Sequence, residues 1–292
     1  MRHPTACGAA VIGLTASMAA PAPELAARVR LLTRATVWTH AAAIPVKFPT
    51  FHPQGMVKIG DTFYVSSVDK DARAGHLFKI DKDGGLAADL PLGAGEMYHP
   101  GGIDFDGASI WVPVAEYRPD SHAIVYRVDP KTMKATEVFR FADHIGALAF
   151  DTDTRTLFGV SWGSRRFYRW RVSADGRVTD PGEPSTLAAN NPEHYVDYQD
   201  CHFAGGGLAL CSGVTVMRPS SLTTFRLGGI ELVDLAAGRP VHQVPIQLWL
   251  PSGLVMTENP MWMETTAAGL RAYFMPEDDR STIYVYDVKS IS

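Results

Sequence analysis

The sequence predicts an all-β protein, a five-bladed β-propeller closed by an N-terminal strand that completes the last blade. A unit of three strand-like segments recurs along the chain at intervals of roughly 45 to 58 residues, a spacing typical of propeller blades. These segments are rich in Val, Ile, Tyr, Phe and Trp, with Gly, Asp and Pro at their joints, and helical periodicity is nearly absent after residue 33. The fifth unit lacks an outer strand, while an N-terminal segment has no partner, which favours closure of the ring.

The first 27 residues have the layout of a secretory signal peptide. Arg2 and His3 precede an apolar run of small residues, and cleavage choices follow Ala20, Ala22 or Ala27. The run is too short to span a membrane well, and no later segment is long and apolar enough to do so. We therefore expect a secreted or periplasmic protein; a disordered Ala-rich leader is the alternative.

Residues 28–292 are expected to form one propeller domain. Three segments align without a gap on His52, His99 and His144, and each continues through a Gly-containing or small step into an apolar strand. The fourth and fifth units are weaker copies. A sixth blade would require residues 173–196, which are too polar and Pro-rich to form one. The expected blades are residues 52–95, 99–140, 144–190, 197–245 and 258–288, with residues 34–46 as the closing strand.

Cys201 and Cys211 lie in "CHFAGGGLALC", which predicts two short strands around a Gly-rich turn. The two positions are symmetric about Gly206, so they could face each other across a hairpin. An oxidising compartment would favour a disulfide there. A pair of buried free thiols is the alternative.

Composition and charge limit the partners. The chain of 292 residues is 46% hydrophobic and 20% charged, enough to bury a sizeable core. The net charge of -4 and the pI near 6.2 give no basic face for nucleic acid. The sequence leaves the oligomeric state open.

The aligned histidines are candidate metal ligands. The first strand of each blade lines the centre of a propeller, so ring symmetry aims these three side chains at one axis. Asn259 holds the equivalent place in the fifth unit; in the fourth, the alignment gives Asp197, with Gln199 or His202 as alternatives. Three imidazoles with an open position are typical of a catalytic site for Zn, Mn or Fe. Alternatively, each histidine caps its strand or binds water.

The loops that join second to third strands open on the same face, and each carries arginine. These residues are candidates for binding a small anionic substrate, because guanidinium pairs well with carboxylate or phosphate: Arg73, Arg118, Arg165, Arg166, Arg218 and Arg280. Glu116, Tyr117 and Glu277 lie in the same loops and are candidate acid or base groups, with Arg118 beside them.

The blade pattern resembles that of the secreted β-propeller superfamily that includes gluconolactonase-like and strictosidine-synthase-like proteins. The resemblance covers most of the chain and implies the fold; lactonase chemistry would follow only by analogy. Those families usually have six blades and bind calcium through carboxylates and amides, whereas this chain offers histidines.

Together these patterns predict a metal-dependent hydrolase or lyase. The metal would activate water or polarise a carbonyl of a lactone, ester or sugar acid. The alternative is a non-catalytic propeller that binds a ligand or a protein partner at the same face.

Overall fold

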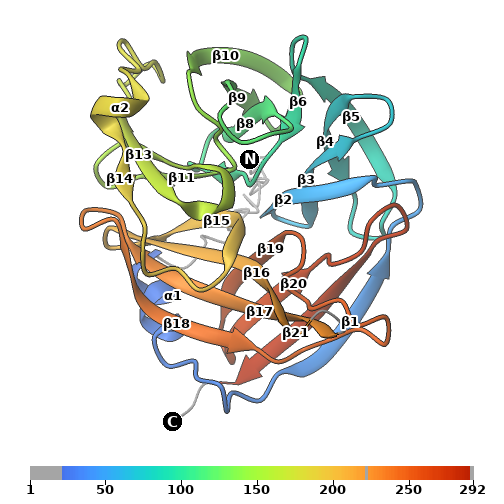
Figure 1. Ribbon diagram of the computed structural model, residues 1–292. Helices are drawn as coiled ribbons and strands as arrows, with labels where there is room; N and C mark the ends of the chain where they lie inside the picture. Colours follow the sequence, from blue (N-terminus) through green and yellow to red (C-terminus); the bar gives the residue numbers. More distant parts are fainter. Residues whose placement is uncertain (1–21, 221–222, 290–292) are drawn as a thin grey trace, which may run out of the picture.

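In the computed structural model, which describes residues 22–220 and 223–289, five antiparallel sheets are arranged around a common centre (Figure 1). Each sheet is one blade, so the predicted five-bladed propeller is confirmed. The strands nearest the centre are largely buried, and all five residues of the inner strand at Ala147–Asp151 are buried.

Blades one and two follow the first two units of the repeat. Blade one contains β2 (His52–Ile59), β3 (Thr62–Asp69), β4 (Ala74–Ile80) and β5 (Leu86–Leu92). Blade two contains β6 (Met97–Pro100), β7 (Asp104–Phe105), β8 (Ile110–Glu116), β9 (Ala123–Asp129) and β10 (Lys134–Phe141).

Blades three and four differ from these mainly in their outer parts. Blade three contains β11 (Ala147–Asp151), β12 (Thr156–Val160), the 3-10 turn η1 (Trp162–Ser164), β13 (Arg166–Arg171), the short helix α2 (Pro184–Leu187) and β14 (Ala189–Asn190). Blade four contains β15 (Asp197–Gly205), β16 (Leu208–Ser220), β17 (Thr223–Asp234) and β18 (Arg239–Ile246).

The fifth blade closes the ring with a strand from the other end of the chain. Its order is β1 (Thr39–Pro45), β21 (Thr282–Lys289), β20 (Gly269–Phe274) and β19 (Met261–Thr266). β1 pairs antiparallel with β21 from Thr39–Asp287 to Pro45–Thr282. The predicted closing strand is therefore confirmed.

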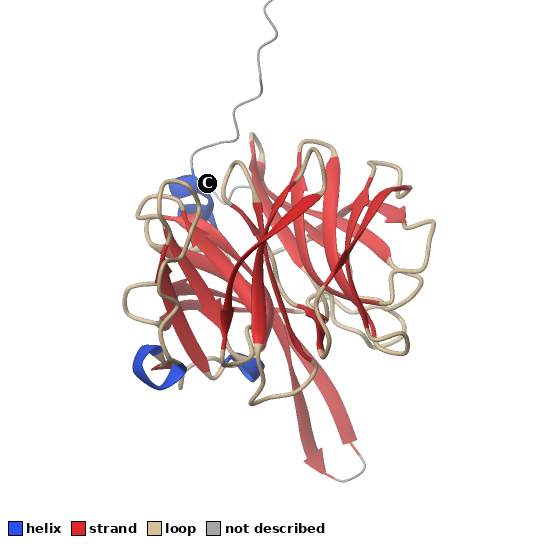
Figure 2. Ribbon diagram, turned by 90° about the horizontal axis from the view of Figure 1, so that it is seen from above, coloured by secondary structure: helices blue, strands red, loops and turns tan. Residues whose placement is uncertain are grey.

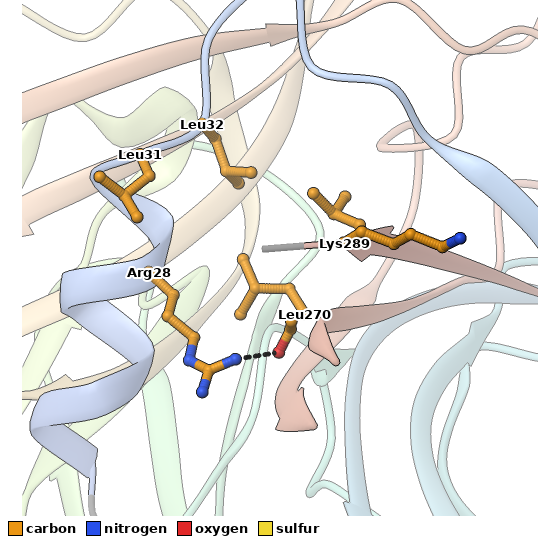
Figure 3. A pocket seen from close by; sticks show the side chains of 7 residues that line it. Arg28, Leu31, Leu32, Leu270 and Lys289 are labelled. Atoms are coloured by element: carbon orange, nitrogen blue, oxygen red, sulfur yellow. Dashed lines mark hydrogen bonds between the residues drawn. The ribbon is translucent and has the colours of Figure 1, made fainter. Parts of the chain in front are cut away.

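Helix α1 (Ala22–Val29) packs against the face of the ring opposite the β16–β17 hairpin (Figure 2). Ala26 and Val29 are buried against blades four and five. Arg28 donates to the carbonyls of Thr266 and Gly269 at 3.0 and 2.9 Å, beside a small pocket (Figure 3). The leader predicted to end at residue 27 thus runs into α1; residues 1–21 lie outside the described part.

The centre of the ring is packed rather than open. A Cβ on Gly55 would lie 2.6 Å from the backbone nitrogen of Ile103, and one on Gly101 would lie 2.1 Å from the carbonyl oxygen of Gly146. Glycine after the repeated histidine therefore permits backbone contact between blades. No helix within residues 22–220 or 223–289 is long and apolar enough to cross a membrane.

Candidate functional site

A buried ionic network joins the inner strands below the histidines. The Asp200 carboxyl accepts hydrogen bonds from the backbone nitrogens of Met56 and Ile103 at 2.7 and 3.0 Å. The Asp104 carboxyl accepts from those of Phe150 and Phe203 at 2.8 and 2.9 Å. These contacts connect blades one to four.

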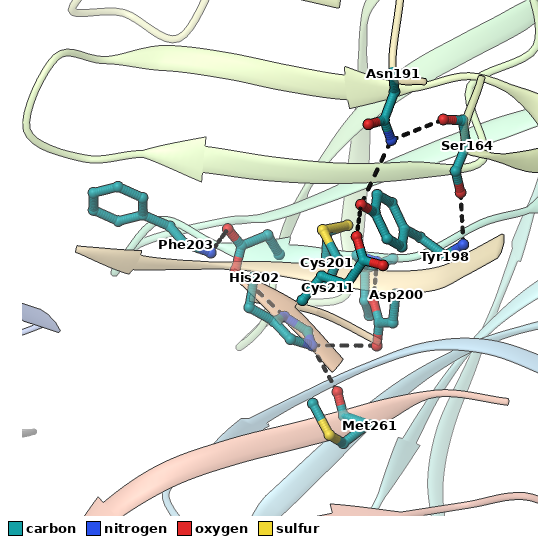
Figure 4. Close-up of a disulfide and its surroundings, with 12 residues drawn as sticks. Ser164, Asn191, Tyr198, Asp200, Cys201, His202, Phe203, Cys211 and Met261 are labelled. Atoms are coloured by element: carbon teal, nitrogen blue, oxygen red, sulfur yellow. Dashed lines mark hydrogen bonds and ion pairs between the residues drawn. A yellow bond between two sulfur atoms is a disulfide. The ribbon is translucent and has the colours of Figure 1, made fainter. Parts of the chain in front are cut away.

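His202 completes this network by contacting blade five. Its Nε2 donates to the carbonyl of Met261 at 2.7 Å and lies 3.3 Å from Asp200 (Figure 4). Burial opposes a charge on the ring, but the carboxylates of Asp200 and Asp104 raise the pKa of His202 to about 10. His202 is thus a charged structural residue in the packed centre.

The predicted cysteine pair lies in the same blade. Cys201 and Cys211 are opposite each other in the β15–β16 pairing and form a disulfide (Figure 4). Both are fully buried.

At the mouth above this network, His99 has a fixed tautomer. Its Nε2 faces the Oε1 of Gln54 at 3.2 Å, and the amide nitrogen of Gln54 donates to the Pro53 carbonyl at 3.2 Å, which orients the amide. His99 therefore donates from Nε2 and carries its lone pair on Nδ1. Nδ1 is buried and has no hydrogen-bond partner among the described residues.

His144 lies beside His99 and is also neutral. The ring centroids are 5.6 Å apart. His144 Nδ1 donates toward the carbonyls of Glu116 and Arg118 at 3.1 and 3.2 Å, which leaves the lone pair on Nε2. Burial lowers the pKa of His144 to about 4. Burial also lowers the pKa of His99 well below its usual range, and His144, His52 and Lys70 lower it further.

Aromatic and basic side chains complete this mouth cluster. The Tyr117 ring packs 4.2 Å from that of His99, and the Trp162 ring lies 4.8 Å from that of His144 in an edge-to-face contact. Lys70 Nζ lies 5.3 Å from the centre of the Tyr117 ring. We use the term mouth cluster for His99, His144, Tyr117, Trp162 and Lys70.

His52 and the other predicted ligands have different partners. His52 Nδ1 pairs with Asp278 at 2.8 Å, and Asn259 donates to the same carboxyl at 2.9 Å. Asp197 turns toward His194, 3.5 Å away. The residues that the structure describes include no group of three or more His, Cys, Asp or Glu that could hold a metal ion. The metal site stays a prediction.

The predicted acid and base groups are distributed over blades two and five. Tyr117 joins the mouth cluster, whereas Glu116 pairs with Arg118 and with His122, the latter at 3.0 Å. Glu277 accepts from Tyr284 and from the backbone of Thr282 in blade five. Of the predicted acid and base groups, Tyr117 lies against His99.

The arginine loops separate in space. Arg73 pairs with Glu96, and Arg166 pairs with buried Asp143 at 2.8 Å. Arg165 lies beside Trp162 in an open depression. Arg218 is exposed on the β16–β17 hairpin, and Arg280 is exposed in the loop before β21. Their roles in binding substrate stay predictions.

Sequence reasoning missed Gln54, Lys70, Trp162 and Asp278. Three of these lie in loops whose arginines are predicted to bind substrate, "SVDKDARAG", "SWGSRRF" and "PEDDRST". The position of these loops at the mouth was therefore the signal that could have identified the three residues, because it makes every polar or aromatic side chain in a loop a candidate.

Residues 10–290 match the model of a family of unknown function (DUF6454), and the chain belongs to this family. No curated protein matches its sequence. Among solved structures, the mannose phosphorylase MPT-4 of Leishmania mexicana is 11% identical with a TM-score of 0.55, over 84% of this chain and 88% of that one.

Two further solved structures match at low identity. A hypothetical protein from Leishmania major is 12% identical with a TM-score of 0.52, over 86% of this chain and 91% of that one. Hydrazine synthase of Kuenenia stuttgartiensis is 13% identical with a TM-score of 0.42, over 80% of this chain; the chain spans 58% of the hydrazine synthase chain. At these identities the likeness to the two Leishmania proteins shows the fold alone.

Proposed function

We propose that this protein is an exported enzyme that acts on a small anionic molecule at the mouth cluster. The observation that carries the proposal is His99, a neutral histidine whose buried Nδ1 has a lone pair and no partner in the described part of the chain. A buried polar atom without a partner is expensive and is typical of a catalytic or ligand-binding position.

The chemistry follows from the protonation state of His99. Its Nδ1 would accept a proton either from a carbon next to a carbonyl, giving an elimination, or from a water that attacks a lactone or ester. Lys70 would attract the substrate's negative charge near the Tyr117 ring. Tyr117, in contact with His99, would donate a proton to the leaving oxygen.

Activity can be screened on sugar acids, their lactones and simple esters, following acid release and the ultraviolet absorbance of unsaturated products. We expect His99→Gln to lower kcat by about 10²- to 10⁴-fold. His40→Gln is the matched control, since His40 is an exposed histidine on β1. If His99→Gln retained full activity, the proposed base would be wrong. Substrate binding without turnover would instead favour a non-catalytic binding protein.

A metal-dependent form of the proposal is tested separately. The wild-type protein, prepared without a histidine tag, is incubated with Zn, Mn and Fe, and its bound metal is measured. If the wild type takes up metal and the double variant His99→Gln, His144→Gln does not, the mouth cluster is a metal site. Absence of uptake would leave the imidazoles to act directly.

A further inference from the structure

An open depression of about 400 Å³ lies beside the mouth cluster, between blades two and three. It is lined by the loop after β8, by η1, by the start of β13, by the end of β14 and by the start of β15. The residues that matter for recognition are Asp120, Trp162, Arg165, Asn190 and Asp197. Trp162 also contacts His144, so the depression and the mouth cluster are continuous.

Trp162 is held there by an uncommon backbone turn. The side chain is 38% exposed. The following residues, Gly163 and Ser164, both have left-handed φ values of 59° and 57°. The Ser164 hydroxyl accepts from the Tyr198 backbone nitrogen at 2.6 Å, and its carbonyl accepts from the Asn191 amide at 3.0 Å. Strained, tightly bonded turns that expose a large ring are typical of binding sites.

A second strained residue borders the same depression. Asp120 has a φ of 45°, and its carbonyl accepts a hydrogen bond from Arg118 at 2.8 Å. Such a φ is uncommon outside glycine and costs energy that the surrounding contacts must offset. Both walls of the depression are therefore fixed in geometry.

The polar groups around Trp162 carry both signs of charge. Arg165 is positive and donates through Nε to the Gly163 carbonyl at 3.1 Å, while Asp120 and Asp197 are negative. Asn190 adds an amide with donors and an acceptor. Arg166 also lines the depression but is paired with buried Asp143, so a carboxylate or phosphate here would meet two negative side chains beside Arg165. Hydroxyl groups, which both donate and accept, match this mixed set better.

We propose that this depression binds the polyhydroxylated part of the ligand, such as a sugar ring. The C–H face of the ring would pack on Trp162, because aromatic faces are negative and sugar C–H groups are weakly positive. Its hydroxyls would bond to Asp120, Arg165, Asn190 and Asp197. The inference rests on the proposed function, which places the acid group of the ligand at Lys70 and the histidines. A ligand that has this acid group at one end and a sugar ring in the depression is a sugar acid.

Saturation-transfer NMR and calorimetry with three probes test this assignment. D-glucuronate has both the acid and the hydroxyls, adipate has acid groups without hydroxyls, and D-glucose has hydroxyls without the acid. We expect D-glucuronate to bind the wild type most tightly. Trp162→Ala should weaken D-glucuronate and D-glucose by about fivefold to tenfold and weaken adipate by less than either.

Two variants make the test specific to this surface. Trp162→Tyr keeps an aromatic face and should restore most of the D-glucuronate affinity. Trp249→Ala removes another exposed tryptophan, 47% exposed in the segment between blades four and five, and should have no effect. The subsite is overturned if adipate binds as tightly as D-glucuronate, if neither hydroxylated probe binds, or if Trp162→Ala matches the wild type.

Failure of the subsite is distinguishable from failure of the proposed function. If adipate and D-glucuronate bind with equal affinity, and both need His99, the sugar-binding depression is wrong and the anionic site at the mouth cluster stands. If D-glucose binds as tightly as D-glucuronate and its binding needs Trp162, the sugar-binding depression stands and the anionic site at Lys70 is wrong.

Discussion

His99 and His144 show how single side chains acquire a function from their surroundings. Both have one ring nitrogen held by a fixed acceptor, Gln54 for His99 and backbone carbonyls for His144. Burial keeps both rings uncharged. His52, at the equivalent repeat position, turns instead to Asp278 of blade five. Equivalent backbone positions therefore give different chemistry.

The lowered pKa of His144 predicts a loss of stability in acid. The His144 ring has a pKa of 6.5 in the unfolded chain and of about 4 in the folded protein. The contribution of the neutral ring to the free energy of unfolding is therefore complete above pH 6.5 and is lost progressively as the pH falls toward 4. We expect His144→Asn, with an amide donor near the same carbonyls, to remove roughly 2–3 kcal/mol of the acid-induced loss between about pH 7 and pH 4.5. Urea unfolding at both pH values measures this difference. An equal acid-induced loss in both proteins would contradict it.

Among the elements, the inner strands are tied together by polar groups as well as by packing. Asp200 and Asp104 accept backbone hydrogen bonds from blades one to four, and His202 reaches blade five. The inner ends of propeller strands leave backbone nitrogens without a neighbour in their own sheet. Buried carboxylates satisfy these groups, and His202 balances their charge.

Removal of one member of this network should destabilise the whole ring. We expect Asp200→Ala to lower the free energy of unfolding by about 3–5 kcal/mol, because it leaves two backbone donors unpaired and His202 with the more distant Asp104 as its remaining carboxylate. Asp200→Asn retains an acceptor and should cost less. Asp89→Ala, which breaks a more exposed pair with His76, is the control and should cost under about 1 kcal/mol. Urea unfolding that ranks Asp89→Ala equal to Asp200→Ala would argue against the role of the network.

For the whole molecule, closure of the ring depends on residues from both ends of the chain. β1 covers the outer edge of β21, and Ile44 packs against the core between blades five and one. Without β1, β21 would present an unpaired edge, and such edges promote association between chains.

Deletion of the closing strand should therefore cause aggregation. A chain that begins at Lys47 lacks β1, whereas one that begins at Arg34 lacks α1 and keeps β1. We expect the chain beginning at Lys47 to elute as aggregates in size-exclusion chromatography and the chain beginning at Arg34 to retain cooperative unfolding. A monomeric, cooperatively folded chain from Lys47 would show that closure does not need β1.

The repeated blades, the closing strand and the cysteine pair are predictable from the sequence, because strand composition, turn residues and spacing are local properties that recur in the copies of the unit. The sequence also placed His99 and His144 at one mouth. The partners of these side chains become visible in the folded chain: His52 turns to Asp278, Asp197 turns to His194, and Trp162 contacts His144. The physical reason is that a repeat fixes the position of the backbone, whereas the direction and charge of a side chain depend on neighbours from other blades, up to 226 residues away for His52 and Asp278.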